Sequence, residues 1–158
     1  MKLPPHIQLR AAAPEDKEFL RSLYATTREF EMSHTPWDEN TRRAFLSEQF
    51  ELQYRHYAST YPGGEHDIIL LDGTPIGRWY IERNSDHILV IDVTILPECR
   101  RGGLGESIVR ALQDEAAATG KRLFGSVERW NPAWRLWQRI GFRIIADDGV
   151  FYRVEWRP

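Results

Sequence analysis

Apolar and polar positions in the first third of the chain follow the spacing of one strand and then of two helices. Ile7–Ala11 has the length and pattern of a short edge strand. Pro14 and the two acidic residues after it suit the first turn of a helix. A break that contains a proline, Met32–Trp37, separates this helix from a second one predicted over Asp38–Tyr57. Helical spacing marks the inward positions of the two helices as Phe19, Leu20, Leu23, Tyr24, Thr27, Phe45, Leu46, Phe50, Tyr54 and Tyr57.

Three strands are predicted in the middle of the chain. His66–Leu71 and Gly77–Arg83 form a hairpin, because Asp72-Gly73 between them is a strong signal for a two-residue turn. His87–Leu96 is long and mostly apolar, as expected of a central strand that is covered on both faces. Pro97 ends this strand.

Helices and strands alternate in the rest of the chain. A glycine-rich turn, residues 102–105, opens a helix that Gly120 ends. A strand over Arg122–Val127 follows, and then Asn131 begins a helix with a proline at its first position. Two strands, 142–146 and 150–156, close the chain as a hairpin. The apolar stripes of the two helices are Leu104, Ile108, Leu112 and Ala116, and then Ala133, Leu136, Trp137 and Ile140.

Length and composition indicate one domain, residues 1–158, of ordinary globular type. The net charge of −2 gives no sign of a basic face, so nucleic acid is not an expected partner. No apolar run is long enough for a membrane helix, and the N-terminus lacks the apolar core of a secretory signal, so we expect a soluble cytoplasmic protein. One cysteine, Cys99, and histidines without ligand spacing argue against a metal site.

The turn at residues 100–105 carries the clearest chemical signal. A buried strand runs into a glycine-rich turn and then a helix, and free amides at a helix N-terminus bind anions, above all phosphate. The phosphate-loop motif fails because no Lys-Ser or Lys-Thr follows the glycines. The dinucleotide fingerprint fails because no third glycine follows Gly105 at the required spacing. A tight structural connection without a ligand is the alternative.

Two segments together resemble the GNAT family of N-acetyltransferases. The run Arg100-Arg101-Gly102-Gly103-Leu104-Gly105 matches every specified position of the family's pyrophosphate loop, [RQ]-x-x-G-x-[GA]. Residues 131–142 resemble its later helix, NPAxxLYxxxGF, and the order of elements agrees along the whole chain. The resemblance implies an α+β fold of three α/β layers, with a mixed sheet of about six or seven strands, splayed central strands and about four helices. It also implies acetyl-CoA as co-substrate and a primary amine as acceptor.

The resemblance further implies a place for each part of acetyl-CoA. The pantetheine arm would pair with the open edge of the central strand at Ile95 and Leu96, and an amide at Ile95 would hold the oxyanion. The pyrophosphate would take the amides of Arg101 through Glu106, next to Arg100. Asn131 would contact the pantetheine, with a helix N-cap as the alternative role. The expected acetyl-CoA contacts are therefore Ile95, Leu96, Arg100, Arg101, Gly102, Gly103, Leu104, Gly105, Glu106, Asn131 and Trp137.

The chain departs from the family at Trp137, where many members carry a tyrosine that protonates the leaving thiolate. An indole N–H is no useful acid, so either Tyr57 or Tyr152 supplies the proton, or the thiolate leaves unaided. Asp92, on the central strand, is the candidate base by position. The alternatives for Asp92 are a structural carboxylate or a water chain to a more distant acid.

The identity of the acceptor is left open by the sequence. Its binding residues are expected near the connection between the two early helices, where Glu31 and Asp38 could bind a cation and Trp37 could stack on it. Ordinary structural roles are the alternative for each of the three. Asp92 is expected to contact the acceptor as well. A non-catalytic module that binds acyl-CoA is the competing function, and a homodimer is compatible with the sequence.

Overall fold

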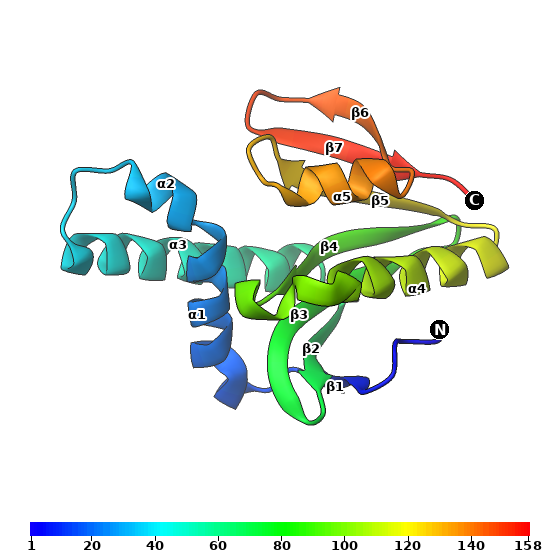
Figure 1. The fold of residues 1–158 in the computed structure, drawn as a ribbon, viewed down its shortest axis with the longest axis horizontal. Coiled ribbons are helices and arrows are strands. Elements are labelled where there is room, and N and C mark those ends of the chain that lie inside the picture. Colours follow the sequence, from blue (N-terminus) through cyan, green and yellow to red (C-terminus); the bar gives the residue numbers. More distant parts are fainter.

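The computed structural model describes the backbone of all 158 residues and every side chain except that of Arg101. Its centre is one seven-stranded sheet, in the order β1-β2-β3-β4-β5-β7-β6 (Figure 1). The pair β4 and β5 is parallel, and the other neighbours are antiparallel. The strands are β1 (Ile7–Ala11), β2 (Glu65–Leu71), β3 (Thr74–Arg83), β4 (His87–Ile95), β5 (Arg122–Glu128), β6 (Arg143–Asp147) and β7 (Phe151–Trp156).

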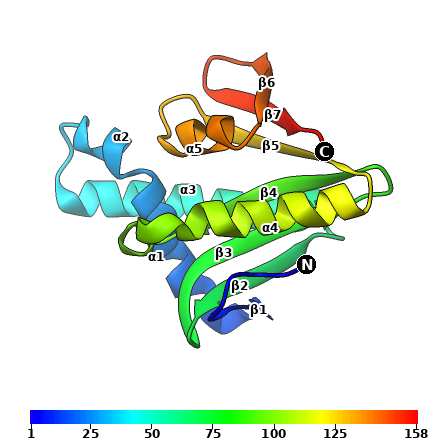
Figure 2. The same ribbon diagram turned by 45° about the vertical axis from the view of Figure 1, so that its right-hand side comes forward.

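Helices cover both faces of this sheet, with α4 and α5 on one side and α1 and α3 on the other (Figures 1 and 2). The helices are α1 (Lys17–Thr27), α2 (Glu29–Ser33), α3 (Glu39–Thr60), α4 (Leu104–Ala118) and α5 (Ala133–Arg139). Short 3₁₀ turns lie at Pro14–Asp16, Pro97–Cys99 and Arg101–Gly103. None of the helices in the described structure is long and apolar enough to cross a membrane.

The core has two parts because helices pack on both faces of the sheet. The larger part joins α4 and α5 to the sheet around Trp79, which is fully buried. The smaller part packs Leu20 of α1 and Phe50 of α3 on Ile68 of β2. The three-layer α+β architecture predicted from the sequence is therefore confirmed.

Two details of the early helices differ from the prediction. A fifth helix, α2, extends over the first two residues of the segment expected to be a break, so the break begins only at His34. The second helix is longer than expected, and Asp38 is its N-cap, where a carboxylate oxygen accepts from the N–H of Thr41 at 2.8 Å. Of the inward positions expected on α3, Phe50 alone is fully buried, and the other four are half-buried.

The central strands β4 and β5 stay paired over only half of their length. His87–Val90 pairs with Arg122–Gly125, and the pairing ends there. At the next residue of β4, Ile91, the register with β3 shifts by one, because Tyr80 faces Asp92 whereas its neighbour Ile81 faces Val90. A bulge of this kind bends its strand, so β4 turns away from β5 at the point where their pairing stops.

Candidate functional site

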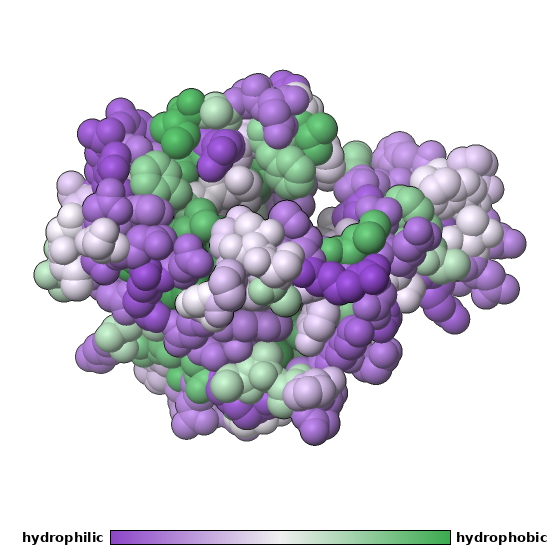
Figure 3. Space-filling model, turned by 180° about the vertical axis from the view of Figure 1, so that it is seen from behind, coloured by the Kyte–Doolittle hydropathy of each residue, from purple (hydrophilic) through white to green (hydrophobic). Residues whose placement is uncertain are grey.

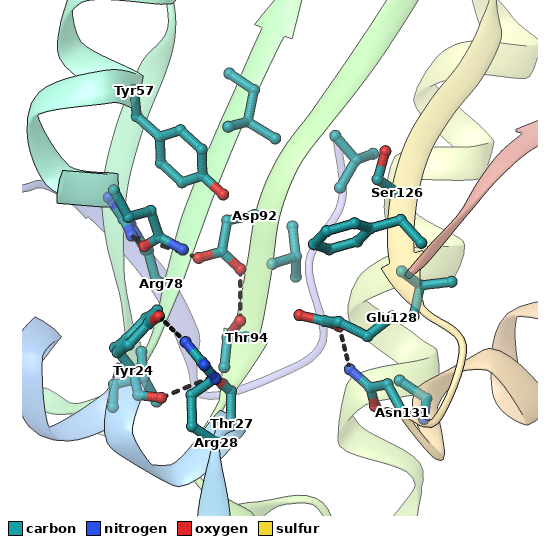
Figure 4. Close-up of a pocket in the computed structure, with 18 of the residues that line it drawn as sticks. Tyr24, Thr27, Arg28, Tyr57, Arg78, Asp92, Thr94, Ser126, Glu128 and Asn131 are labelled. Carbon is teal, nitrogen blue, oxygen red and sulfur yellow. Dashed lines mark hydrogen bonds and ion pairs between the residues drawn. The ribbon is translucent and has the colours of Figure 1, made fainter. Parts of the chain in front are cut away.

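A cleft of about 340 Å³ lies where β4 and β5 separate. Its walls are the second half of β4, the end of β5, one face of α1 and the middle of α3. The residues before α5 and at the start of β7 complete its rim. The cleft thus gathers side chains from most of the chain around one gap in the sheet (Figure 4).

Asp92 lies on the β4 wall with both carboxylate oxygens engaged. One oxygen accepts from the hydroxyl of Thr94 at 2.5 Å, and the other accepts from Nη1 of Arg78 at 3.4 Å. The Arg78 side chain is 3% exposed, whereas that of Asp92 is 22% exposed. These two contacts hold the Asp92 carboxylate in place on the cleft wall, with a buried guanidinium beside it.

Arg78 is itself held by neutral groups on its other sides. Its Nη1 donates to the side-chain oxygen of Gln53 at 3.0 Å, and its Nε donates to Nε2 of His66 at 3.1 Å. The guanidinium also lies over the rings of Tyr57 and Tyr80, at 5.3 and 5.2 Å. Burial and then the charge of Arg78 lower the pKa of His66 to about 4, so the imidazole is neutral and can accept that bond.

A second ion pair lines the cleft where α1 meets α2. Arg28, between α1 and α2, forms a two-point contact with the Glu31 carboxylate, both at 2.9 Å, and also donates to the hydroxyl of Tyr24. Burial raises the pKa of Tyr24, since the charged form is the one that burial disfavours. The charge of Glu31, which the sequence proposes for binding a cation, is thus already matched inside the protein.

Glu128 and Asn131 occupy the β5 wall, across the cleft from Asp92 and Thr94 (Figure 4). The Glu128 carboxylate accepts from Nδ2 of Asn131 at 3.1 Å. The side-chain oxygen of Asn131 accepts from the N–H of Ala133, the first residue of α5, at 2.9 Å, although the N-cap itself is Pro132, one residue later than expected.

Two of the three aromatic residues considered for proton donation line the cleft. Tyr57 points into it, and burial and then the charge of Asp92 raise the pKa of its hydroxyl above the ordinary value of 10. Trp137 is 8% exposed and packs on Phe142 at 4.8 Å between ring centroids. Tyr152 is not among the lining residues and packs on Trp134 instead.

The backbone at the end of β4 offers one amide on the cleft side. The N–H of Leu96 donates to the carbonyl of Ile76 on β3 at 2.8 Å. Successive residues of a strand direct their N–H groups to opposite edges, so the amide of Ile95 points away from β3. The carbonyl of Ile95 accepts from Nε of Arg100 at 2.9 Å, which fixes the start of the following turn.

That turn leads into α4 through two glycines in the left-handed region. Gly102 and Gly103 both have φ near +78°, which a residue with a side chain adopts only with strain. A Cβ built on either glycine meets no atom within 4 Å, so the backbone is open to a ligand there. Because Gly103 is the N-cap and has no side chain, the first-turn amides of α4 are free to bind an anion.

The structure brings together some of the predicted site residues and separates others. Asp92, Glu31, Asn131 and Trp137 line one cleft, and residues 95–106 follow from its β4 wall. Trp37 lies outside the cleft, packed on Phe45 at 5.1 Å. Sequence reasoning missed Arg28, Arg78 and Glu128, which set the charge of the cleft together with Glu31 and Asp92.

No group of three or more metal-ligating side chains is present among the described residues. A model of the "Acetyltransferase (GNAT) family" matches residues 21–142 of the chain, and no curated protein sequence matches.

Three solved structures show the same fold. The PaiA N-acetyltransferase from Thermoplasma acidophilum, in complex with coenzyme A, is 16% identical, with 96% of this chain and 99% of that one covered and a TM-score of 0.69. An acetyltransferase from Thermus thermophilus is 18% identical (96% and 97% covered, TM-score 0.65). A GNAT family acetyltransferase from Elizabethkingia anophelis with acetyl-CoA bound is 13% identical (98% and 100% covered, TM-score 0.60).

Proposed function

Because the chain belongs to the GNAT family of acetyltransferases, we propose that it transfers the acetyl group of acetyl-CoA to a primary amine by direct attack in a ternary complex. The observation that carries this proposal is the continuity of two features: a polar cleft between splayed strands, and an open helix N-terminus at the end of the same strand. The first suits an amine and the second a diphosphate. The cytoplasm, where acetyl-CoA is available, is the proposed location.

The open turn and α4 supply the proposed binding site for the diphosphate. The backbone amides from Arg101 to Glu106 would bind its oxygens, assisted by Arg100. The geometry fits this group, since a Cβ at Gly102 or Gly103 would stand in empty space that a ligand can fill. The pantetheine arm would run along the free edge of β4 at Ile95 and Leu96, and would reach Asn131 and Trp137 from the β5 side.

The reaction would proceed at the mouth of the cleft. The acceptor enters as an ammonium ion and loses one proton to a base. Its neutral nitrogen attacks the thioester carbon, a C–N bond forms, and negative charge develops on the carbonyl oxygen, which the amide of Ile95 would stabilise. The C–S bond then breaks, its electron pair leaves on sulfur, and the nitrogen releases its second proton.

Asp92 is the proposed base, and Glu31 and Asp92 are the proposed acceptor-binding residues. The contacts with Arg78 and Thr94 hold this carboxylate at the cleft wall, where a bound ammonium group could reach it. We propose that the proton it takes then passes on to solvent. Trp37 would contact only an acceptor that extends beyond α2.

The thiolate is proposed to leave without a protein acid. A CoA thiol has a pKa comparable to that of cysteine, about 8.5, so the thiolate is an adequate leaving group near neutral pH. Tyr57 has a raised pKa and is a weak acid toward it, although its hydroxyl can still donate a hydrogen bond. Trp137 would shape the cleft rather than transfer a proton.

The test is thiol release from acetyl-CoA with a broad panel of primary amines. Steady release that depends on one class of amine, together with mass-spectrometric detection of the N-acetyl product, is expected. If the protein binds acetyl-CoA but releases no thiol with any amine, the competing function applies, and the chain is a non-catalytic module that binds acyl-CoA.

A further inference from the structure

The cleft contains one carboxylate without a cationic partner among the described residues. Glu31 is paired with Arg28 and Asp92 with Arg78, whereas Glu128 accepts only from the neutral amide of Asn131. The five charged side chains that line the cleft thus leave one negative charge unmatched, and it belongs to Glu128. A partly buried, unmatched carboxylate attracts a cation.

The arginine that follows Glu128 in the sequence does not neutralise it. Arg129 lies 3.7 Å from the carboxylate of Asp147 and stacks over the ring of Tyr152 at 5.5 Å. Its side chain is therefore directed to the C-terminal hairpin. Figure 4 shows the Glu128 carboxylate pointing into the cleft, toward the wall that carries Asp92.

Beside Glu128, the rim of the cleft is formed by exposed apolar side chains. Trp130, Val150 and Phe151 all line the cleft, yet they are 43%, 46% and 38% exposed. Figure 3 shows apolar side chains gathered on the surface of the C-terminal hairpin, to which β7 belongs. We call Trp130, Val150 and Phe151 the apolar rim.

Strand pairing joins the apolar rim to the free carboxylate. Phe151 is the direct partner of Glu128 across the antiparallel pair β5 and β7, so both side chains project from the same face of the sheet. The carbonyl of Val150 accepts from the N–H of Arg129 at 3.0 Å, which holds the start of β7 against the end of β5. An anion and an apolar surface are thus fixed next to each other.

We propose that the acceptor is a primary amine that carries an aromatic or branched aliphatic group within a few bonds of its nitrogen. Glu128 binds its ammonium group and the apolar rim covers its apolar group. This assignment rests on the proposed acetyl transfer and deepens it. A polar amine would leave the apolar rim exposed to water, and a neutral apolar molecule would leave Glu128 unmatched.

The test measures binding, so that it does not depend on turnover. Isothermal titration of the protein saturated with CoA compares three probes at pH 7: 2-phenylethylamine, the neutral 2-phenylethanol and the polar 2-methoxyethylamine. We expect 2-phenylethylamine to bind at least about tenfold more tightly than either of the other two. Equal binding of the three probes, or no binding of any, would overturn the assignment.

Two variants separate the contributions of charge and apolar contact. Glu128→Gln should lower the affinity for 2-phenylethylamine about tenfold or more and leave the affinity for 2-phenylethanol unchanged. Phe151→Ser should lower the affinity for 2-phenylethylamine several-fold and leave the affinity for 2-methoxyethylamine unchanged. The matched controls, Glu48→Gln and Phe30→Ser, change exposed residues of the same type outside the cleft and should alter no affinity. An unchanged melting shift with acetyl-CoA shows that each variant is folded.

The measurements of binding and turnover can refute the assignment of the acceptor and the proposed acetyl transfer independently of each other. Selective binding of 2-phenylethylamine without thiol release would refute the acetyl transfer and leave the assignment of the cleft intact. Thiol release that Glu128→Gln leaves unchanged, with a polar amine as the best acceptor, would refute the assignment and leave the acetyl transfer intact.

Discussion

The contact between Trp137 and Gly125 allows the packing role of the tryptophan to be tested quantitatively. A Cβ built on Gly125 would lie 3.1 Å from Cζ3 and 3.5 Å from Cη2 of Trp137, so the indole occupies the space that a side chain on β5 would take. Trp137→Phe removes the outer part of the indole. A residual gap of roughly 40 Å³ costs about 1 kcal/mol, and the lost burial adds about 1–2 kcal/mol.

Gly125→Ala should rescue this loss. In the single variant, where Trp137 is present, the new methyl group is overpacked against the indole. This costs about 1–3 kcal/mol, partly offset by the reduced flexibility of the unfolded chain. In Trp137→Phe the same methyl group fills the gap. The double variant should therefore lose at least about 1 kcal/mol less than the sum of the single variants.

The assay is urea unfolding of the four proteins, followed by thiol release with the best amine. Turnover of Trp137→Phe should stay within about tenfold of the wild type, because only packing and one N–H donor are lost. If the loss in free energy of unfolding of the double variant equals the sum of the two single losses within about 0.5 kcal/mol, the packing argument is refuted. Loss of turnover in Trp137→Phe at unchanged acetyl-CoA affinity would show that the indole takes part in the reaction.

Three further predictions test the turn, the base and an ion pair at the N-terminus. Gly103→Glu should abolish the melting shift caused by acetyl-CoA, whereas Gly73→Glu, at a hairpin glycine with similar φ and equal open space, should keep it; equal shifts would disprove the loop assignment. Asp92→Asn should lower turnover by roughly 10²–10⁴-fold at neutral pH and by less at high pH, where the amine is already neutral, and a loss below about threefold would exclude proton transfer to this residue. The hydrogen bond from Arg10 lowers the pKa of Asp16 below its ordinary value of 3.8, so this pair stabilises the fold above that pH and the contribution is lost as pH falls. Acid titration of the free energy of unfolding should therefore be shallower in Asp16→Asn than in the wild type, and identical slopes would contradict the pair's role.

Apolar patterning predicted most of the fold, because α4 buries a regular stripe and β4 is apolar along most of its length. The strong helical stripe over residues 104–116 and the apolar strand at 87–96 are found where they are expected. The five-residue helix α2 was not predicted, since an element this short has too few positions to show a period, and a proline follows it closely.

The charge of the site could not be predicted in the same way, because it depends on register. Asp92 meets Arg78 only because the shift at Ile91 moves the register of β4 by one residue, and a slip of one residue exchanges the two faces of a strand. Glu128 was missed for a simpler reason: the strand was predicted to end at Val127, one residue too early. Extended by one residue, the alternation would have put Glu128 on the same face as Ser126.

The separation of β4 and β5 creates two unpaired strand edges in the interior of a sheet. At the outside of a sheet such edges recruit strands from other proteins and lead to aggregation. Here the two free edges face each other across a cleft of about 340 Å³, while helices cover both faces of the sheet (Figure 2). The free hydrogen-bonding groups of β4 and β5 are therefore recessed within the sheet. They are not presented along an outer edge, where they would recruit a strand of another protein.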